Sequence, residues 1–316
     1  MTPTNPANRT DARRPLKVGI QLPEVEREVR WPEQLDMIRA IEDLGFDSIW
    51  LGEHLLYRWA DRPPRGPWEA WSMLAATAAV TTRVEFGPLV ACTNFHNPAL
   101  LAKQAATIDE ISGGRFVLGL GAGWNDTEFR AYGFPYDHRV ERFEEAFAII
   151  RGLLRDGIVD FDGRWYQARD CELLPRGPRL AGPPLMIGSK GPRMLRATLP
   201  FVDSWNVWFS DTGNRPAGVP RLRELVDSVC LAVGRDPAEV ERTVAVLVRL
   251  QGGTGRLQGE TASDPTPPLE GSPAEMADVL RGFAAEGIDH VQLVVDPITL
   301  GSIRTLGPVL AELDRG

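Results

Sequence analysis

The sequence predicts an α/β barrel of the (β/α)8 type, in which eight parallel strands alternate with helices. Short apolar segments alternate with helical patterns along the chain, which is typical of a parallel sheet built from βαβ units. The long loops follow the second, fourth and seventh strands, on the face where barrel enzymes carry their active sites. A doubly wound open sheet has the same elements and stays open as the alternative.

The first half of the chain supplies four of the expected strand–helix units. Its strands are short apolar runs, expected at 16–22, 46–51, 83–91 and 116–120. Helices are expected at 31–44, 68–81, 98–111 and 137–154. In the first helix Leu35, Ile38 and Ile41 recur at helical spacing, and Gly45 is a suitable C-cap.

The second half repeats the pattern. Strands are expected at 184–188, 202–207, 242–250 and 290–295, and helices at 190–198, 220–233, 272–287 and 303–313. Ser272 and Glu275 have the spacing of a capping box. Gly307 and Pro308 predict a break or restart in the last helix.

We expect one barrel domain over residues 15–316, preceded by a loose polar tail over residues 1–14. Two insertions interrupt it after the fourth and seventh strands, at about 125–180 and 251–271. The first contains a predicted hairpin at 156–168, turned at Asp162 and Gly163.

Composition limits the classes of function. The net charge of -8 argues against a nucleic-acid partner or an anionic membrane. No apolar run approaches the roughly 18 residues of a membrane span. The cysteines, 3 in number and widely spaced, favour a reducing, cytoplasmic setting, and the 4 scattered histidines predict no metal site. A small-molecule substrate is therefore expected.

The glycine-rich stretch from Gly113 to Asn125 is the most distinctive part of the chain. An apolar run ends in Gly119, Gly121 and Gly123, which is consistent with a buried strand whose end something flat or bulky approaches closely. Tight packing of the strand itself is the alternative. The spacing is not G-x-G-x-x-G, so a phosphate cradle is not indicated at this place.

Candidate site residues follow the strand ends. Glu53 and His54 form a titratable pair after the second strand, suited to acid–base work or to hydrogen bonding a carbonyl or peroxide. Small residues with Lys190 and Arg193 before a helix favour an anion site over Gly188–Gly191. A structural histidine and an ordinary helix start are the respective alternatives.

Several segments, in this order, resemble the bacterial luciferase-like superfamily of flavin- and deazaflavin-dependent oxidoreductases over about residues 16–314. They are GFDSIW at 45–50 leading to Glu53-His54, NPALLAK at 97–103, ISGGR at 111–115 leading to GLGAGW at 119–124, RFEE at 142–145, FDG at 161–163 and GSKGP at 188–192. The branch labelled probable coenzyme F420-dependent oxidoreductase is the most similar.

The resemblance implies a luciferase-like barrel with FMN or coenzyme F420 at its mouth, and Glu53 and His54 as the catalytic pair. It also implies a cis peptide bond at Leu89–Val90. The expected cofactor-binding residues are Leu89, Val90, Cys92, Ala122, Gly123, Trp124, Gly188, Ser189, Lys190 and Gly191. A homodimer formed by the helices after the second and third strands is expected, and a separate flavin or F420 reductase is a candidate partner.

Trp124 departs from the pattern, because deazaflavin dehydrogenases of this superfamily carry a Glu acid at that position. We therefore expect a reduced-flavin monooxygenase acting on a small organic substrate, with Lys190 on the phosphate. The alternative is an F420-dependent reductase or dehydrogenase. A non-catalytic flavin-binding barrel is a third hypothesis. An aldolase or glycosidase is disfavoured, because the chain lacks paired carboxylates and a buried strand-end lysine.

Overall fold

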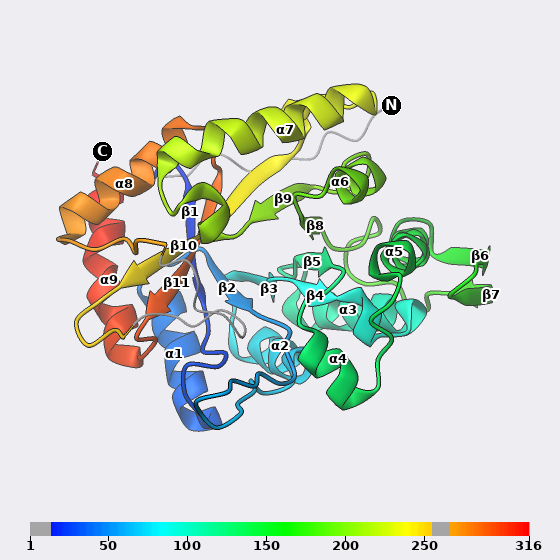
Figure 1. The fold of residues 1–316 in the computed structure, drawn as a ribbon, viewed down its shortest axis with the longest axis horizontal. Helices are drawn as coiled ribbons and strands as arrows, with labels where there is room; N and C mark the ends of the chain where they lie inside the picture. Colours follow the sequence, from blue (N-terminus) through cyan, green and yellow to red (C-terminus); the bar gives the residue numbers. More distant parts are fainter. Residues whose placement is uncertain (1–13, 255–265, 316) are drawn as a thin grey trace.

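A parallel sheet forms the centre of the molecule in the computed structural model, which describes residues 14–254 and 266–315. Its 9 strands run in the order β3-β2-β1-β11-β10-β9-β8-β5-β4. An isolated bridge between Phe86 of β3 and Phe116, which precedes β5, links the two ends of this strand order. Helices surround this nearly closed sheet (Figure 1). The predicted α/β barrel is therefore confirmed.

The barrel strands agree with the predicted runs to within a few residues at most ends. They are β1 (Lys17–Gln21), β2 (Ser48–Leu51), β3 (Glu85–Pro88), β4 (Ala91–Cys92), β5 (Leu118–Gly121), β8 (Leu185–Gly188), β9 (Ser204–Val207), β10 (Glu241–Arg249) and β11 (His290–Asp296). One predicted strand, 83–91, is two strands in the structure. A cis peptide bond at Leu89–Val90 separates β3 from β4, as the family resemblance implied.

Most helices also follow the predicted pattern. They are α1 (Trp31–Asp43), α2 (Ala70–Val80), α3 (Pro98–Ser112), α4 (Asp126–Tyr132), α5 (Arg139–Asp156), α6 (Pro192–Thr198), α7 (Val219–Ala232), α8 (Pro273–Ala285) and α9 (Leu300–Leu313). The predicted break at Gly307–Pro308 was wrong, because α9 runs through Pro308 without interruption. Helix α4 was not predicted, and its 7 residues are too few to show a clear helical period.

The predicted hairpin is formed by β6 (Ile158–Asp162) and β7 (Gln167–Glu172), and it projects beside α5 at the edge of the molecule (Figure 1). The predicted two-residue turn at Asp162–Gly163 was wrong. Asp162 pairs with Gln167, so residues 163–166 form the turn. Glu145 of α5 accepts backbone hydrogen bonds from three residues of this turn, which explains the longer loop.

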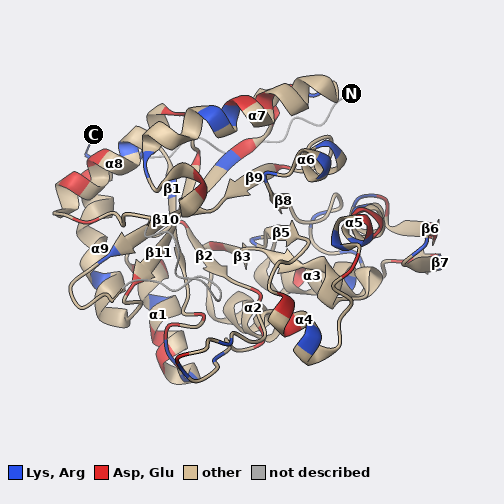
Figure 2. Ribbon diagram, viewed as in Figure 1, with Lys and Arg blue, Asp and Glu red and all other residues tan. Residues whose placement is uncertain are grey.

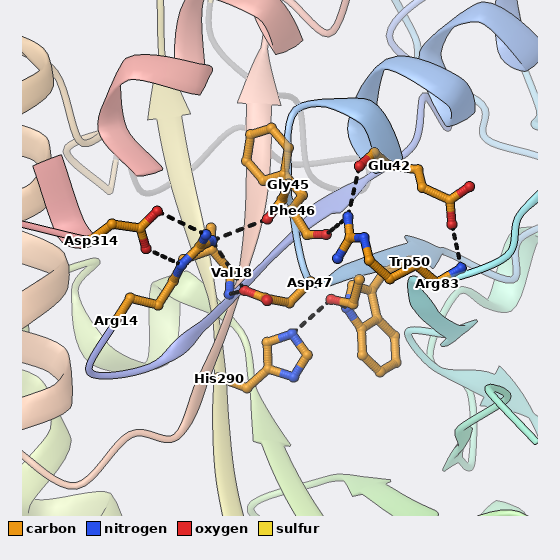
Figure 3. Close-up of polar contacts among 11 residues, drawn as sticks. Arg14, Val18, Glu42, Gly45, Phe46, Asp47, Trp50, Arg83, His290 and Asp314 are labelled. Atoms are coloured by element: carbon orange, nitrogen blue, oxygen red, sulfur yellow. Dashed lines mark hydrogen bonds and ion pairs between the residues drawn. The ribbon is translucent and has the colours of Figure 1, made fainter. Parts of the chain in front are cut away.

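Residues 1–13 of the tail predicted over residues 1–14, and residues 255–265 of the loop after β10, lie outside the described residues, whereas Arg14 is anchored and not loose. Arg14, the first described residue, joins the two ends of the chain at the amino-terminal face of the barrel (Figure 3). Its Nε donates to Asp314 Oδ1 at 2.9 Å, and its Nη1 lies 3.3 Å from Asp47 Oδ2. Asp47 also accepts a hydrogen bond from the Val18 amide at 2.7 Å. This face is held by charge pairs and hydrogen bonds.

His290 is a buried structural residue at the start of β11. The Trp50 indole donates to Ser48 Oγ at 2.7 Å, and Ser48 Oγ lies 2.7 Å from His290 Nε2 (Figure 3). The Ser48 hydroxyl accepts from Trp50 and keeps its own proton, which it can donate to His290 Nε2 when that nitrogen is unprotonated. Burial, with a smaller effect of Lys17, lowers the pKa of His290 well below its ordinary value. The neutral ring is thus fixed by its partners.

Candidate functional site

The carboxyl ends of the parallel strands meet at one mouth, where the predicted site residues gather. His54 and Trp124 follow β2 and β5, and their ring centroids lie 5.5 Å apart in an edge-to-face arrangement. The Cys92 amide, at the end of β4, donates to Glu53 Oε2 at 2.6 Å. Lys190, after β8, is instead joined to Asp211 of the segment after β9. Residues far apart in the chain therefore lie close together at the mouth, but the predicted site residues form separate groups and not one cluster.

Glu53 has a different environment from the one that the sequence suggested. Its carboxylate is 5% exposed and accepts hydrogen bonds from the Trp71 indole at 2.8 Å and the Cys92 amide at 2.6 Å. A third contact joins its Oε1 to His96 Nε2 at 2.7 Å. Both oxygens are therefore engaged by α2 and the β4 segment, and Glu53 ties the end of β2 to the end of β4.

His54 is held by a residue that sequence reasoning missed. His54 Nδ1 lies 2.9 Å from Glu128 Oε1, and Glu128 Oε2 accepts the Leu55 amide at 2.7 Å. Glu128 is 1% exposed, in the short helix α4. No sequence signal marked it, because a lone Glu in an unpredicted helix resembles a solvated side chain.

A second buried carboxylate, Glu24, lies on the other side of the imidazole. Its Oε1 is 3.7 Å from His54 Nε2 and accepts the Tyr57 hydroxyl at 2.6 Å. Gln21 Nε2 donates to the other oxygen at 2.8 Å. A Cβ on Gly52 would lie 2.4 Å from Glu24 Oε2, so only glycine leaves room for this carboxylate. The sequence analysis did not single out Glu24 either.

The two carboxylates determine the charge of His54. Burial alone would lower its pKa, but Glu24 and Glu128, with a smaller contribution from Glu53, outweigh burial and raise the pKa above its ordinary value. A raised pKa extends the protonated form of the imidazole to higher pH. The arrangement therefore provides a proton donor whose ring orientation is fixed from both sides.

Aromatic rings form a row that starts at Trp124 and continues through His54. The rings of His54 and Tyr57 are 4.8 Å apart, and those of Tyr57 and Trp59 are stacked at 5.9 Å. Trp124 is 52% exposed, although its ring contacts the half-buried His54. The row provides an apolar, planar surface next to the proton donor.

The glycines of β5 and β8 make room for a residue of the chain itself. A Cβ on Gly121 would lie 2.7 Å from Val90 Cγ2, and a Cβ on Gly188 would lie 3.0 Å from both Val90 methyl groups. The Gly123 position is bounded in the same way by Cys92 Sγ and Phe129. The alternative of tight packing thus accounts for these glycines, because their neighbours are protein side chains.

The predicted anion loop is only partly free for an anion. Gly191 N donates to Ser189 Oγ at 3.2 Å, and the Trp205 indole donates to Ser189 O at 2.7 Å. Arg193 was expected to add charge here, but it pairs with Glu144 of α5 at 2.6 Å. Lys190 is therefore the cation of this loop, with a side chain that is 62% exposed beside Asp211.

Two buried amide atoms lie without partners inside the protein, and they bear on whether a polar heterocycle suits the mouth. Gln292 Nε2 and Gln21 Oε1 are buried and have no hydrogen-bond partner in the described part of the chain. Their strands are neighbours, since Gly19 of β1 pairs with Gln292 of β11. Buried polar atoms of native proteins are normally satisfied. Both atoms are enclosed by the protein, so the feature that suits a flat heterocycle at the mouth is the aromatic row from Trp124 through His54 to Tyr57 and not these amides.

The comparisons with known proteins give the family. The luciferase-like monooxygenase family matches residues 16–251, and the chain therefore belongs to this family. Over 181 residues it is 33% identical to 5,10-methylenetetrahydromethanopterin reductase of Archaeoglobus fulgidus, a match that covers 57% of this chain and 49% of that protein. The chain thus matches about half the length of this curated relative.

Solved structures share the fold at low sequence identity. An F420-dependent secondary alcohol dehydrogenase in complex with an F420-acetone adduct has a TM-score of 0.78 at 19% identity, over 94% of this chain and 99% of the other. The FMN-bound oxygenating constituent of 3,6-diketocamphane monooxygenase, a type II Baeyer-Villiger monooxygenase of Pseudomonas putida, has a TM-score of 0.72 at 16% identity, over 95% and 98% of the two chains. The barrel is thus a luciferase-like barrel, and the protein belongs to a family of oxidoreductases.

Two properties of residues 14–254 and 266–315 complete the description of the site. No group of three or more His, Cys, Asp or Glu residues in these ranges is placed to hold a metal ion. In the same ranges, no helix combines the length and apolar character that a membrane crossing needs.

Proposed function

We propose that this chain is a hydride-transferring oxidoreductase that uses coenzyme F420 and reduces a carbonyl or imine group of a small substrate. The position of His54 between Glu128 and Glu24 carries this proposal. A substrate atom that gains a hydride also requires a proton on its neighbour, and His54 is the group whose pKa is raised for donating one. The reductase relative supports the same chemistry.

The roles of the other residues follow from their contacts. A reduced deazaflavin supplies the hydride when it is bound. The residues that we expect to hold it are Leu89, Val90, Cys92, Ala122 to Trp124 and Gly188 to Gly191. Glu53 binds Trp71, Cys92 and His96, so we assign it a positioning role. His54 donates the proton, and Glu128 keeps its ring oriented.

A second candidate is an FMN-dependent monooxygenase, which the sequence analysis placed first. It is favoured by Trp124, an exposed aromatic ring where dehydrogenases of this superfamily carry an acid. The similarity to an FMN-bound monooxygenase is compatible with it. A separate flavin reductase is needed only for this second candidate.

Equilibrium binding of oxidised F420 and oxidised FMN, each followed by fluorescence, separates the two candidates. Tight F420 binding with weak FMN binding supports the proposal, and oxidation of reduced F420 by acetone is then the first reaction to measure. The reverse order of affinity favours the monooxygenase. If correctly folded protein binds neither, both candidates are contradicted while the barrel stands.

The predicted homodimer remains a prediction. Leu100 and Ile111 of α3 are 56% and 47% exposed, which leaves apolar surface on a helix that the prediction assigned to the interface. Light scattering on the purified protein tests it, and a monomeric mass at micromolar concentration would contradict it.

A further inference from the structure

Trp124 has an exposed ring on a backbone that is held in place. Its exposed fraction, 52%, is the largest among the described tryptophans. The Tyr136 hydroxyl donates to Trp124 O at 3.0 Å, and Arg139 Nη1 donates to Gly123 O at 2.7 Å. The indole N–H of Trp124 has no hydrogen-bond partner among the described residues. The ring is therefore exposed at a fixed position and not in a loose segment.

A second exposed tryptophan shows how such a ring is otherwise engaged. Trp68 is 48% exposed, but its indole donates to Val29 O at 2.7 Å, and the Arg30 guanidinium lies 5.9 Å from its ring centroid. Trp124 has neither kind of contact. Aromatic surface that is open in this way is typical of the lining of a small-molecule site.

The ring of Trp124 lies next to the proton that the proposed reaction uses. Its centroid is 5.5 Å from that of His54. Glu128 occupies His54 Nδ1 at 2.9 Å, whereas His54 Nε2 is 3.7 Å from Glu24 Oε1, which is longer than a hydrogen bond. Nε2 is therefore the nitrogen whose proton a substrate oxygen can accept. A group on the Trp124 ring and a carbonyl at His54 must lie within a few bonds of each other.

The charges beside Trp124 do not select an ion. Helix α4 follows Trp124 directly and has an acidic first turn and a basic last turn (Figure 2). Asp126 pairs with Arg130 at 3.1 Å, and Glu128 is held at His54. Because these charges already have partners within the protein, a neutral aromatic group suits the open indole face.

We propose that Trp124 makes the enzyme selective for carbonyl compounds that carry an aromatic ring, which stacks on the indole while the carbonyl oxygen faces His54 Nε2. The inference rests on the proposed hydride transfer from coenzyme F420. In that reaction the carbonyl carbon gains a hydride from reduced F420, which is thereby oxidised. The π-electron pair of the C=O bond moves to the oxygen, which takes the proton of His54, and the product is an alcohol.

The test compares 4-phenyl-2-butanone with 4-cyclohexyl-2-butanone, which share the ketone and differ in whether the ring is aromatic. With reduced F420, kcat/KM should favour the phenyl ketone by about two- to tenfold, the range expected for an aromatic pair. In Trp124→Leu this ratio should fall to about one, whereas Trp124→Phe should keep part of it. The ratio cancels any effect of the substitution on cofactor binding, because both ketones react with the same loaded enzyme.

Trp68→Leu is the matched control, since it removes an exposed indole that is bonded to Val29 instead of lying beside His54. It should keep the ratio. A second measurement needs no turnover. In protein saturated with oxidised F420, the phenyl ketone should shift the NMR resonance of the Trp124 indole N–H saturably, and the cyclohexyl ketone should shift it less.

Equal kcat/KM for the two ketones in the unchanged protein overturns the selectivity and leaves the proposed function intact. Reduction of acetone but of neither larger ketone also overturns the substrate class alone. Failure to bind F420, or to reduce any of the three ketones with it, overturns both the inference and the proposed function. A preference that persists in Trp124→Leu, or that Trp68→Leu also removes, overturns the role of Trp124.

Discussion

Glu128 Oε1 lies 2.9 Å from His54 Nδ1, although the two residues are 74 positions apart in the chain. The other oxygen of Glu128 accepts the Leu55 amide at 2.7 Å, so one carboxylate fixes both the ring and the backbone that follows it. Glu24 faces the opposite ring nitrogen at 3.7 Å. The two buried carboxylates raise the pKa of the imidazole, so it holds its proton to higher pH, and this is the property on which the proposed reaction depends.

Glu128→Gln should lower the pKa of His54, because it removes one of the charges that raise it. A proton donor with a raised pKa is active below that pKa and loses activity as the pH rises through it. The alkaline limb of the turnover profile should therefore move to lower pH. Turnover at neutral pH should fall by about 10-fold to 100-fold. The pH profile and an NMR titration of His54 measure the two effects.

Asp126→Asn is the control for this variant, since Asp126 lies on the same helix and pairs with Arg130 on the surface at 3.1 Å. It should leave the pH profile unchanged. If Glu128→Gln keeps the original alkaline limb while remaining folded, Glu128 does not set the charge of His54.

Glu53→Gln should destabilise the fold more than it changes the chemistry. The carboxylate is buried and accepts from Trp71 and Cys92, and an amide would turn a donor toward one of these partners. Loss of about 1–3 kcal/mol in the free energy of unfolding is expected. Urea denaturation measures it, and the exposed Asp61→Asn serves as reference. Unchanged stability together with a large loss of turnover would instead favour a direct catalytic role for Glu53.

Gly121→Ala should destabilise the protein because the new Cβ would lie 2.7 Å from Val90 Cγ2. Overpacking of this kind costs about 1–3 kcal/mol. A second substitution, Val90→Ala, removes the clashing methyl and should recover part of the loss. A double-mutant cycle by urea denaturation measures this coupling.

Gly301→Ala is the control, since its nearest neighbour would be Thr299 Oγ1 at 3.6 Å. Additive effects of Gly121→Ala and Val90→Ala would show that Val90 is not the residue for which Gly121 leaves room.

His290→Gln should make the protein less sensitive to acid. The folded-state pKa of His290 is lowered well below its ordinary value by burial. The unfolded state therefore takes up a proton below about pH 6.5 that the folded state does not, and stability falls as the pH falls through that value. The unchanged protein should lose up to about 1.4 kcal/mol per pH unit relative to the variant between about pH 6.5 and pH 5. Protonation of His54 contributes equally to the stability of both proteins and therefore cancels in the difference between their free energies of unfolding.

Urea denaturation across this pH range gives the two stability curves. Parallel curves would contradict a buried neutral His290. Glutamine keeps an oxygen that can accept the Ser48 hydroxyl, so a folded variant is expected.

The sequence predicted most of the fold because local signals were strong. Apolar runs marked the barrel strands, and spacing such as that of Leu35, Ile38 and Ile41 marked α1. Three predictions about the elements differ from the structure, and each difference has an identifiable cause. Helix α4 is short, and Pro308 was read as a break although α9 continues through it. The hairpin turn was misplaced because Glu145, a residue distant in sequence, holds the turn residues.

The order of elements, the strand ends that carry the site, and the presence there of His54, Glu53 and Trp124 all followed from sequence patterns. The partners of these side chains followed from the three-dimensional fold. Glu53 turns to His96, whereas Glu128 and Glu24 enclose His54. The pKa of a side chain depends on its burial and on its distance from other charges. Parallel strands set both, because they bring residues together regardless of their separation along the chain.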